Sequence, residues 1–358
     1  MIRVEIETVW RFTRESDSGS MLVMLGFLNE IRASGKITRA AEGANVSYRH
    51  AWNLIEKWSE FFGTQLVERR RGHGTNLTAF GEKLVWAGQR LQARLGPQLQ
   101  NLGQELQSEI NALLPNSVSV LRVHASHGFA VSCLRELLGK QTGLSVDFRF
   151  VGNANSLVSL ANGSCDLAGM HLPQGALRKQ YVAASRRLVS PGTHRVIGFV
   201  TREMGLMVRR GNPLEIRSVA DLRNPAIRFV NRDPDSGSRV LFDQLLKEGG
   251  VDGARISGYE HGEFTHAAVA AYVASGMADV SFGVEAAARQ FDLDFVRLVT
   301  EDYFFVCRQD ILETEPVRRI LSVMRSEAFY QAISALPGYR VNEPGAVLTM
   351  QEVFRSTQ

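Results

Sequence analysis

Cysteine is scarce in this sequence, and long apolar runs are missing from it. The 358 residues include three cysteines, Cys133, Cys165 and Cys307, which are widely spaced and form no Cys-x-x-Cys pair. This number and spacing argue against a disulfide framework and a zinc knuckle. No stretch of 18 or more uncharged apolar residues occurs, so we expect no membrane span. The first residues also lack the apolar block of a signal peptide, and we expect a reduced, cytoplasmic protein.

The usual catalytic signatures are missing as well. The sequence contains no GxxxxGK(S/T), no GxSxG and no GxGxxG after an expected strand. His261, Glu263 and His266 could suggest a metal cluster, but histidines five residues apart do not share a helix face, unlike the pair in HExxH. We therefore expect no enzyme, no metal site and no cofactor.

The charge is concentrated at the front of the chain. The net charge is +4, and residues 1–96 hold 14 basic and 10 acidic residues, whereas the rest holds 27 of each. A length of 358 residues with 44% hydrophobic residues suits two or three globular domains. The basic excess of the first domain favours an anionic partner such as duplex DNA.

Residues 1–80 have the pattern of a winged helix-turn-helix. A strand is expected over 2–7, helices over 21–34, 38–44 and 47–62, and then a basic hairpin in LVERRRGHGTNLTAFG. Ala51, Ile55, Trp58 and Phe62 form one apolar stripe on the third helix. That helix fits a major groove, and the hairpin can lie along phosphates. A small helical domain with an exposed basic hairpin is the plainer alternative.

The opposite face of the 47–62 helix is polar, and we expect it to read base edges, while the hairpin contacts phosphates. The expected DNA-binding residues are Ser47, Tyr48, Arg49, His50, Asn53, Lys57, Arg69, Arg70, Arg71 and His73.

Residues 81–116 are expected to form a linker helix, continuous from Phe80 to Leu113 and kinked at Gly96-Pro97. Its apolar residues recur at nearly heptad spacing. They are Leu84, Leu91, Leu95, Leu99, Leu102, Leu106, Ile110 and Leu113. The seam predicts a homodimer or homotetramer, although packing against the chain's own winged helix covers part of it.

Residues 117–358 alternate strands and helices, which predicts two α/β lobes and an α/β fold overall. RVIGFVTREMGLMVRRG is expected to form two strands that cross between the lobes, and a helix is expected over 314–334. Lobes joined by double crossovers make a clamshell with a ligand cleft at the carboxyl ends of the strands.

Two segments resemble known families. SGKITRAAEGANVSYRHAWNLIEKWSEFFGTQLVERRRGHGTNLTAFGEKL resembles the ModE-type winged helix of molybdate-responsive regulators and, more distantly, the LysR type. RFVNRDPDSGSR and FTHAAVAAYVASGMADVSFGVEAA resemble the two-lobed, type II periplasmic-binding-protein-like domain of one-component regulators and molybdate-related proteins. The small OB-like molybdate modules of ModE are missing from this chain. The resemblance implies a DNA-binding regulator with a ligand-binding clamshell.

Helix amino-termini that face such a cleft can bind an anion. The strands SVSVLRVHA and IRFVNR each end at a helix start rich in serine and glycine. The expected ligand-binding residues are Ser126, His127, Gly128, Asn153, His171, Ser236, Gly237, Ser238, Arg239, Thr265 and His266.

The resulting hypothesis is a one-component transcription regulator that binds an operator and senses a small oxyanion. The resemblance favours molybdate or tungstate, with formate as a competitor, and target genes for molybdoenzymes, formate dehydrogenase or oxyanion uptake. An anion solute-binding protein and an enzyme of molybdenum cofactor handling remain as alternatives. DNA retardation would argue against the first, and turnover would favour the second.

Overall fold

The computed structural model describes residues 2, 4–14, 17–20, 22–70, 74–113, 120–140 and 144–354. The chain divides into two compact units, Ile6–Gln92 and the combination of Met1–Glu5 with Ala93–Gln358. Within the described ranges, no helix is both long and apolar enough to cross a membrane.

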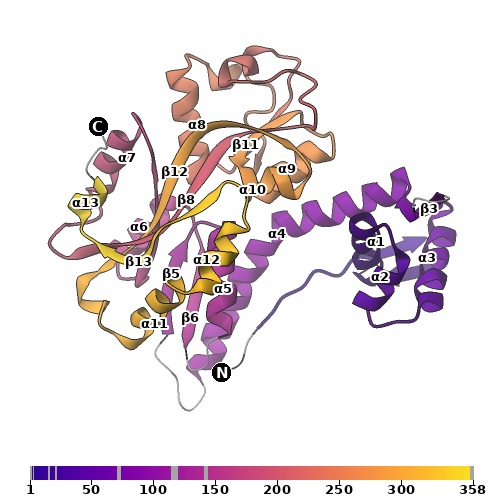
Figure 1. Cartoon of the computed structure of the whole chain (residues 1–358), viewed down its shortest axis with the longest axis horizontal. Helices are drawn as coiled ribbons and strands as arrows, with labels where there is room; N and C mark the ends of the chain where they lie inside the picture. The colour runs from indigo at the N-terminus through magenta and orange to yellow at the C-terminus, as the bar shows by residue number, and fades with distance from the viewer. Residues whose placement is uncertain are drawn as a thin grey trace. The chain divides into compact units, whose positions relative to one another are not determined.

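The unit Ile6–Gln92 has three short helices and a two-stranded wing (Figure 1). Its elements are β1 (Arg11–Arg14), β2 (Asp17–Ser20), α1 (Leu22–Ser34), α2 (Ile37–Gly43), α3 (Tyr48–Phe62), β3 (Val67–Arg70), β4 (Gly74–Leu77) and the first part of α4 (Ala79–Ala112). Helix α3 begins after Ser47, whose hydroxyl accepts a bond from His50 N at 3.2 Å, and ends at Gly63 in the left-handed region. The expected helix-turn-helix and wing are present.

The expected strand over residues 2–7 is wrong. Among the described residues of that segment none is in a strand, and the first strands are β1 and β2, an antiparallel hairpin. Side-chain amides of α4 bind the backbone of this segment instead. Asn111 Oδ1 accepts from Ile2 N at 2.9 Å, and Gln107 Oε1 accepts from Val4 N at 3.3 Å. The backbone groups of Ile2 and Val4 are therefore bonded to a helix and not to a neighbouring strand.

The second unit is built on one curled sheet that serves two lobes. Among the described residues its strands follow the order β10-β9-β11-β8-β12-β7-β5-β6, and β13 pairs with β8. Strands β5, β6 and β7 belong to lobe one, and β9, β10 and β11 to lobe two; within each lobe these strands are parallel. The long antiparallel strands β8 and β12 run through both lobes (Figure 1).

The elements of the two lobes alternate as expected. They are β5 (Val120–Ala125), α5 (Phe129–Gly139), β6 (Ser145–Phe150), α6 (Asn153–Ala161), β7 (Leu167–Pro173), α7 (Arg178–Ser185), β8 (His194–Val208), η1 (Val219–Arg223), β9 (Phe229–Arg232), α8 (Gly237–Glu248), η2 (Gly253–Arg255), β10 (Gly262–Glu263), α9 (His266–Ala274), β11 (Val280–Val284), α10 (Glu285–Gln290), β12 (Asp294–Arg308), η3 (Gln309–Ile311), α11 (Glu315–Met324), α12 (Glu327–Ser334), β13 (Tyr339–Leu348) and α13 (Met350–Phe354).

Two expectations for this unit are corrected. The segment expected to form two crossover strands is the single strand β8, because it pairs with β12 along its whole length. The helix expected over 314–334 is two helices, α11 and α12, because the Ser326 hydroxyl accepts from Phe329 N at 3.2 Å and starts a new helix. The core between sheet and helices includes Phe199, Phe305 and Phe329, all fully buried.

Candidate functional site

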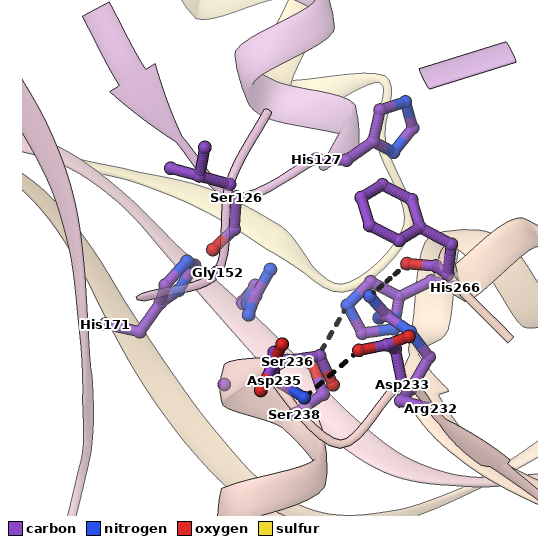
Figure 2. A pocket seen from close by; sticks show the side chains of 14 residues that line it. Ser126, His127, Gly152, His171, Arg232, Asp233, Asp235, Ser236, Ser238 and His266 are labelled. Atoms are coloured by element: carbon purple, nitrogen blue, oxygen red, sulfur yellow. Dashed lines mark hydrogen bonds between the residues drawn. The ribbon is translucent and has the colours of Figure 1, made fainter. Parts of the chain in front are cut away.

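A cavity of about 50 Å³ lies between the two lobes. A polar space of this size suits a few waters or one small anion. It is lined by Ser126, His127, Val151, Gly152, His171, Arg202, Arg232, Asp233, Asp235, Ser236, Gly237, Ser238, Phe264 and His266. Figure 2 shows residues from both lobes around this one space.

The start of α8 forms one wall of the cavity. Strand β9 ends at Arg232, and the turn Asp233–Ser236 leads into the helix, where the Ser236 hydroxyl accepts from Arg239 N at 3.1 Å. The Ser238 hydroxyl lies 3.3 Å from His266 Nε2, at the start of α9. The free N–H groups and positive dipole end of such a helix start favour an anion.

Arg232 places a positive charge in the cavity wall. Its side chain donates to two backbone carbonyls, from Nε to Glu263 at 3.3 Å and from Nη2 to Phe264 at 2.7 Å. Nη1 has no hydrogen-bond partner within the described part of the chain. Burial and the neighbouring Arg202 lower the pKa of Arg232 to about 9, and the half-buried Asp233 offsets this only in part. Arg232 is therefore a buried cation whose hydrogen bonding is incomplete.

The second arginine, Arg202, is neutralised by its own partner. Its Nε and Nη2 donate to Glu301 Oε2 at 2.8 and 2.6 Å, and His171 Nδ1 lies 3.5 Å from the same oxygen. Burial opposes the charge of Glu301, but Arg202 and His171 outweigh it and lower the pKa of Glu301 to about 2. The ion pair thus adds polarity to the cavity without adding net charge.

The three histidines of the cavity are neutral near pH 7. Burial, followed by the charge of Arg232, lowers the pKa of His127 to about 4. Burial and Arg202 lower the pKa of His171 to about 4, and burial and Arg232 lower that of His266 well below its usual value. Neutral imidazoles offer hydrogen bonds without charge, so Arg232 supplies the cation that a bound anion would meet.

The structure brings seven of the expected ligand-binding residues to the cavity. They are Ser126, His127, His171, Ser236, Gly237, Ser238 and His266. Gly128 does not line the cavity and is the amino-terminal cap of α5. Asn153 is the first residue of α6 and follows the lining residue Gly152, and its side chain lies outside the part of the chain that the structure describes.

Arg239 and Thr265, two further expected ligand-binding residues, have side chains that are bound to other partners. Arg239 Nε donates to Asp243 at 3.1 Å, and the guanidinium lies 4.0 Å from the ring centre of Tyr259. The Thr265 hydroxyl donates to the carbonyl of Ala93 in α4 at 2.8 Å. Neither residue lines the cavity.

Sequence reasoning missed both arginines of the cavity. Arg202 is 3% exposed and Arg232 is 6% exposed, and each lies in a strand of otherwise buried residues. A charged residue inside an apolar strand is rare without a partner. The arginines in FVTREM and FVNRD have this setting, and it could have marked Arg202 and Arg232 as site residues from the sequence.

The two lobes touch at the edge of the cavity. A methyl group on Gly152 of lobe one would lie 2.4 Å from the carbonyl oxygen of Asp235 of lobe two. Both residues line the cavity. The described conformation is therefore closed at this point, and it requires glycine for steric reasons.

In the other unit, α3 exposes the polar face that the sequence predicts. Tyr48, Arg49, His50, Asn53 and Lys57 are exposed, as is Ser47 before them. Ala51, Ile55 and Trp58 are buried on the opposite face with the side chains of α1 and α2. The polar face is therefore open to solvent within its own unit.

The wing is positioned against the end of α1. Thr75 N donates to the carbonyl oxygen of Gly35 at 2.9 Å, and a Cβ on Gly74, whose φ is +82°, would lie 2.6 Å from the same oxygen. Strand β3 carries Arg69 and Arg70. Arg71 and His73 lie outside the described residues.

Helix α4 carries part of its apolar seam on the surface. Leu102, Leu106 and Ile110 are 51%, 44% and 39% exposed, and Leu113 just after the helix is 87% exposed. These residues follow one another at spacings of four, four and three, which places them on one face of a helix.

Two family models match the chain. The model described as PBP superfamily domain matches residues 134–325, and that of the bacterial regulatory helix-turn-helix protein, lysR family, matches residues 22–82. The uncharacterized protein YvgK of Bacillus subtilis is 32% identical over 200 residues, which cover 56% of this chain and 64% of YvgK. This chain thus spans less than two thirds of that relative.

ModE proteins match over shorter stretches. The molybdenum transport protein ModE of Azotobacter vinelandii is 28% identical over 38% of this chain and 52% of its own length. Among solved structures, a peroxide-bound mutant of OxyR from Corynebacterium glutamicum is 16% identical, covers 87% of this chain and 94% of its own, and has a TM-score of 0.44.

Proposed function

Because this chain belongs to the PBP superfamily, and carries a helix-turn-helix of the bacterial lysR regulatory family ahead of that domain, we propose that it is a DNA-binding transcription regulator controlled by a small anion. The helix-turn-helix unit binds duplex DNA, and residues 117–358 bind the effector. Within the residues described, no group of three His, Cys, Asp or Glu side chains could hold a metal ion.

The DNA-binding role is supported by the exposed polar face of α3. Arg49, His50 and Asn53 supply donors and acceptors for base edges, and Lys57 is a cation for a phosphate. The rest of the proposed DNA contacts comprise Ser47 and Tyr48 at the start of α3 and Arg69, Arg70, Arg71 and His73 of the wing.

The observation that carries the effector role is the incompletely bonded Arg232 in a small cavity. An anion in this space would complete the bonding of Nη1 and offset a buried charge, which charge-assisted hydrogen bonds favour. The hydroxyls of Ser126 and Ser236 and the start of α8 add neutral donors. The volume of about 50 Å³ suits a small oxyanion.

Molybdate or tungstate is the favoured effector, and formate is the competitor. The support is twofold: hydroxyls, amide groups and one cation match an oxyanion, and related proteins are named for molybdenum transport and as ModE regulators. Such an effector fits target genes for molybdoenzymes, formate dehydrogenase or oxyanion uptake.

We also propose that the regulator assembles as a homodimer or homotetramer through α4. The support is the exposed apolar row of Leu102, Leu106, Ile110 and Leu113. Pairing with the same row of a second copy would remove these side chains from water.

A DNA-binding titration of the full chain tests the proposal. A duplex is first selected from a random pool by the wild-type chain, and its Kd is measured with and without sodium molybdate or sodium formate. We expect an anion to change that Kd at least fivefold, which is the lower range of allosteric coupling. A chain that selects no duplex would contradict the DNA-binding role, and a Kd that no anion changes would contradict the effector role.

A further inference from the structure

Helix α4 runs through Pro97 without interruption, and the hydrogen bond that is missing there is replaced by a side chain from the effector-binding domain. Proline has no backbone N–H, so the carbonyl of Ala93, four residues earlier, lacks its helical donor. The Thr265 hydroxyl donates to that carbonyl oxygen at 2.8 Å. Thr265 is 1% exposed, so the bond is shielded from water. A residue 172 positions away in the sequence thus completes the hydrogen bonding of α4.

Thr265 lies between two residues of the cavity wall. Phe264 precedes it and His266 follows it, and both line the cavity. Arg232 donates to the carbonyl of Phe264 at 2.7 Å. The Thr265 oxygen also accepts from Ala268 N at 2.9 Å and so caps α9. A movement of the wall around Arg232 therefore reaches the Thr265 hydroxyl within one residue of backbone.

A second contact holds the same turn of α4 to lobe two. The Glu263 side chain is 1% exposed, and its carboxylate oxygens have no hydrogen-bond partner within the described part of the chain. Arg94 Nε lies 3.5 Å from Glu263 Oε2. A buried carboxylate is costly without a nearby cation, so this pair favours the position of Arg94 next to Ala93.

The same helix is bound to lobe one two turns later. The side-chain amide of Asn101 accepts from Phe150 N at 2.8 Å and donates to Phe150 O at 2.9 Å. Phe150 ends β6, and the next residues, Val151 and Gly152, line the cavity. Pro97 lies midway between Ala93 and Asn101, and the segment 93–101 spans about 12 Å at 1.5 Å per residue.

We propose that residues 93–101 form a strap across the two cavity walls, hinged at Pro97, through which the cavity controls α4. A change in the separation of the walls must bend this segment, and the missing hydrogen bond at Pro97 lets it bend there. The Thr265 hydroxyl holds the Ala93 carbonyl on one side of this hinge. Helix α4 continues from Ala93 towards Ala79 into the helix-turn-helix unit, so the bend is inherited by the DNA-binding part. This inference rests on the proposed function, because it requires an anion in the cavity.

Paired variants on the two sides of the bond test the strap. Thr265→Val removes the hydroxyl at nearly constant shape, and Thr265→Ser is its matched control, since it keeps the hydroxyl. Pro97→Ala acts from the helix side, because it restores the N–H donor to Ala93 and leaves the cap of α9 untouched. For each full-length variant, the Kd for molybdate and the Kd for the selected duplex with and without molybdate are measured. Formate is the second probe.

We expect the Kd for the selected duplex to differ at least fivefold between the presence and the absence of molybdate, in the wild type and in Thr265→Ser, and the ratio is taken as the larger Kd over the smaller. In Thr265→Val and in Pro97→Ala it should fall to within twofold of one, while the Kd for the anion stays within threefold of the wild-type value. If Thr265→Val fails to fold, Pro97→Ala decides by itself. Wild-type ratios in the folded variants would overturn the strap and leave the effector role intact. A wild type that binds neither anion, or binds one without a change in DNA Kd, would overturn the effector role and the strap together.

Discussion

Gly152→Ala should act as a wedge between the two lobes. The added methyl group would lie 2.4 Å from the Asp235 carbonyl oxygen, whereas an ordinary contact needs about 3.4 Å, so the walls must separate by roughly 1 Å at this point. A hydrogen bond near 2.9 Å that lengthens by roughly 1 Å is no longer a bond. An anion held by both walls then loses at least one charge-assisted bond, worth about 1.5–3 kcal/mol.

That loss corresponds to roughly 10- to 150-fold weaker anion binding, since about 1.4 kcal/mol is a factor of ten. Isothermal titration of the full-length chain with sodium molybdate, and separately with sodium formate, measures it. Gly139→Ala is the matched control on lobe one, because a Cβ there meets no atom within 4 Å. An affinity in Gly152→Ala within threefold of the control would refute the closed, two-walled site.

Three further predictions concern α3, the cavity and α4. Lys57→Ala should weaken binding to selected and random duplexes alike and reduce the slope of log binding constant against log salt concentration by about one. Asn53→Ala should instead change the preferred sequence. Equal losses of affinity on both duplexes for Asn53→Ala would contradict its role in base reading. Because the pKa of His171 is about 4 in the folded chain and about 6.5 in the unfolded chain, the unfolded chain binds more protons between these values. The free energy of unfolding that the neutral ring contributes above pH 6.5 is lost as the pH falls to 4, by roughly 3 kcal/mol. Urea unfolding at several pH values gives the slope of the free energy of unfolding against pH. This slope should differ between the wild type and His171→Gln by up to one proton. Leu106→Glu should shift sedimentation towards the monomer while Glu105→Ala, at an exposed position outside the apolar row, does not. An unchanged oligomer in Leu106→Glu would contradict the proposed seam.

Local signals explain why the front of the chain was predictable from sequence. The capping Ser47, the stripe of Ala51, Ile55 and Trp58, and the terminal Gly63 define α3 within 17 consecutive residues. The start of α8 was predictable for the same reason, because serine and glycine at a helix start act within one turn. Each of these features depends on neighbours in the sequence.

The charge of the cavity depends on residues far apart in the sequence. Arg202 meets Glu301 because β8 pairs with β12, and the buried setting of Arg232 depends on the pairing of β9 with β10. The hydrogen bond from Thr265 to the Ala93 carbonyl joins residues that are equally remote in the sequence. Arg239 is different, because its partner Asp243 lies four residues later on the same helix. That spacing favours an ion pair on the helix surface, and it was visible in the sequence.

In the proposed regulator, the incompletely bonded charge of Arg232 binds a small anion in the cavity. A thermal-shift comparison of the wild type and Arg232→Gln with molybdate, tungstate, sulfate, phosphate and formate tests this claim most directly. At an anion concentration a hundred times its Kd, binding adds about 2.7 kcal/mol of stability, or roughly 5–10 °C in Tm for a domain of this size. We expect such a rise for molybdate, tungstate or formate in the wild type and none in Arg232→Gln. Equal shifts in both proteins, or no shift with any of the five anions, would contradict it.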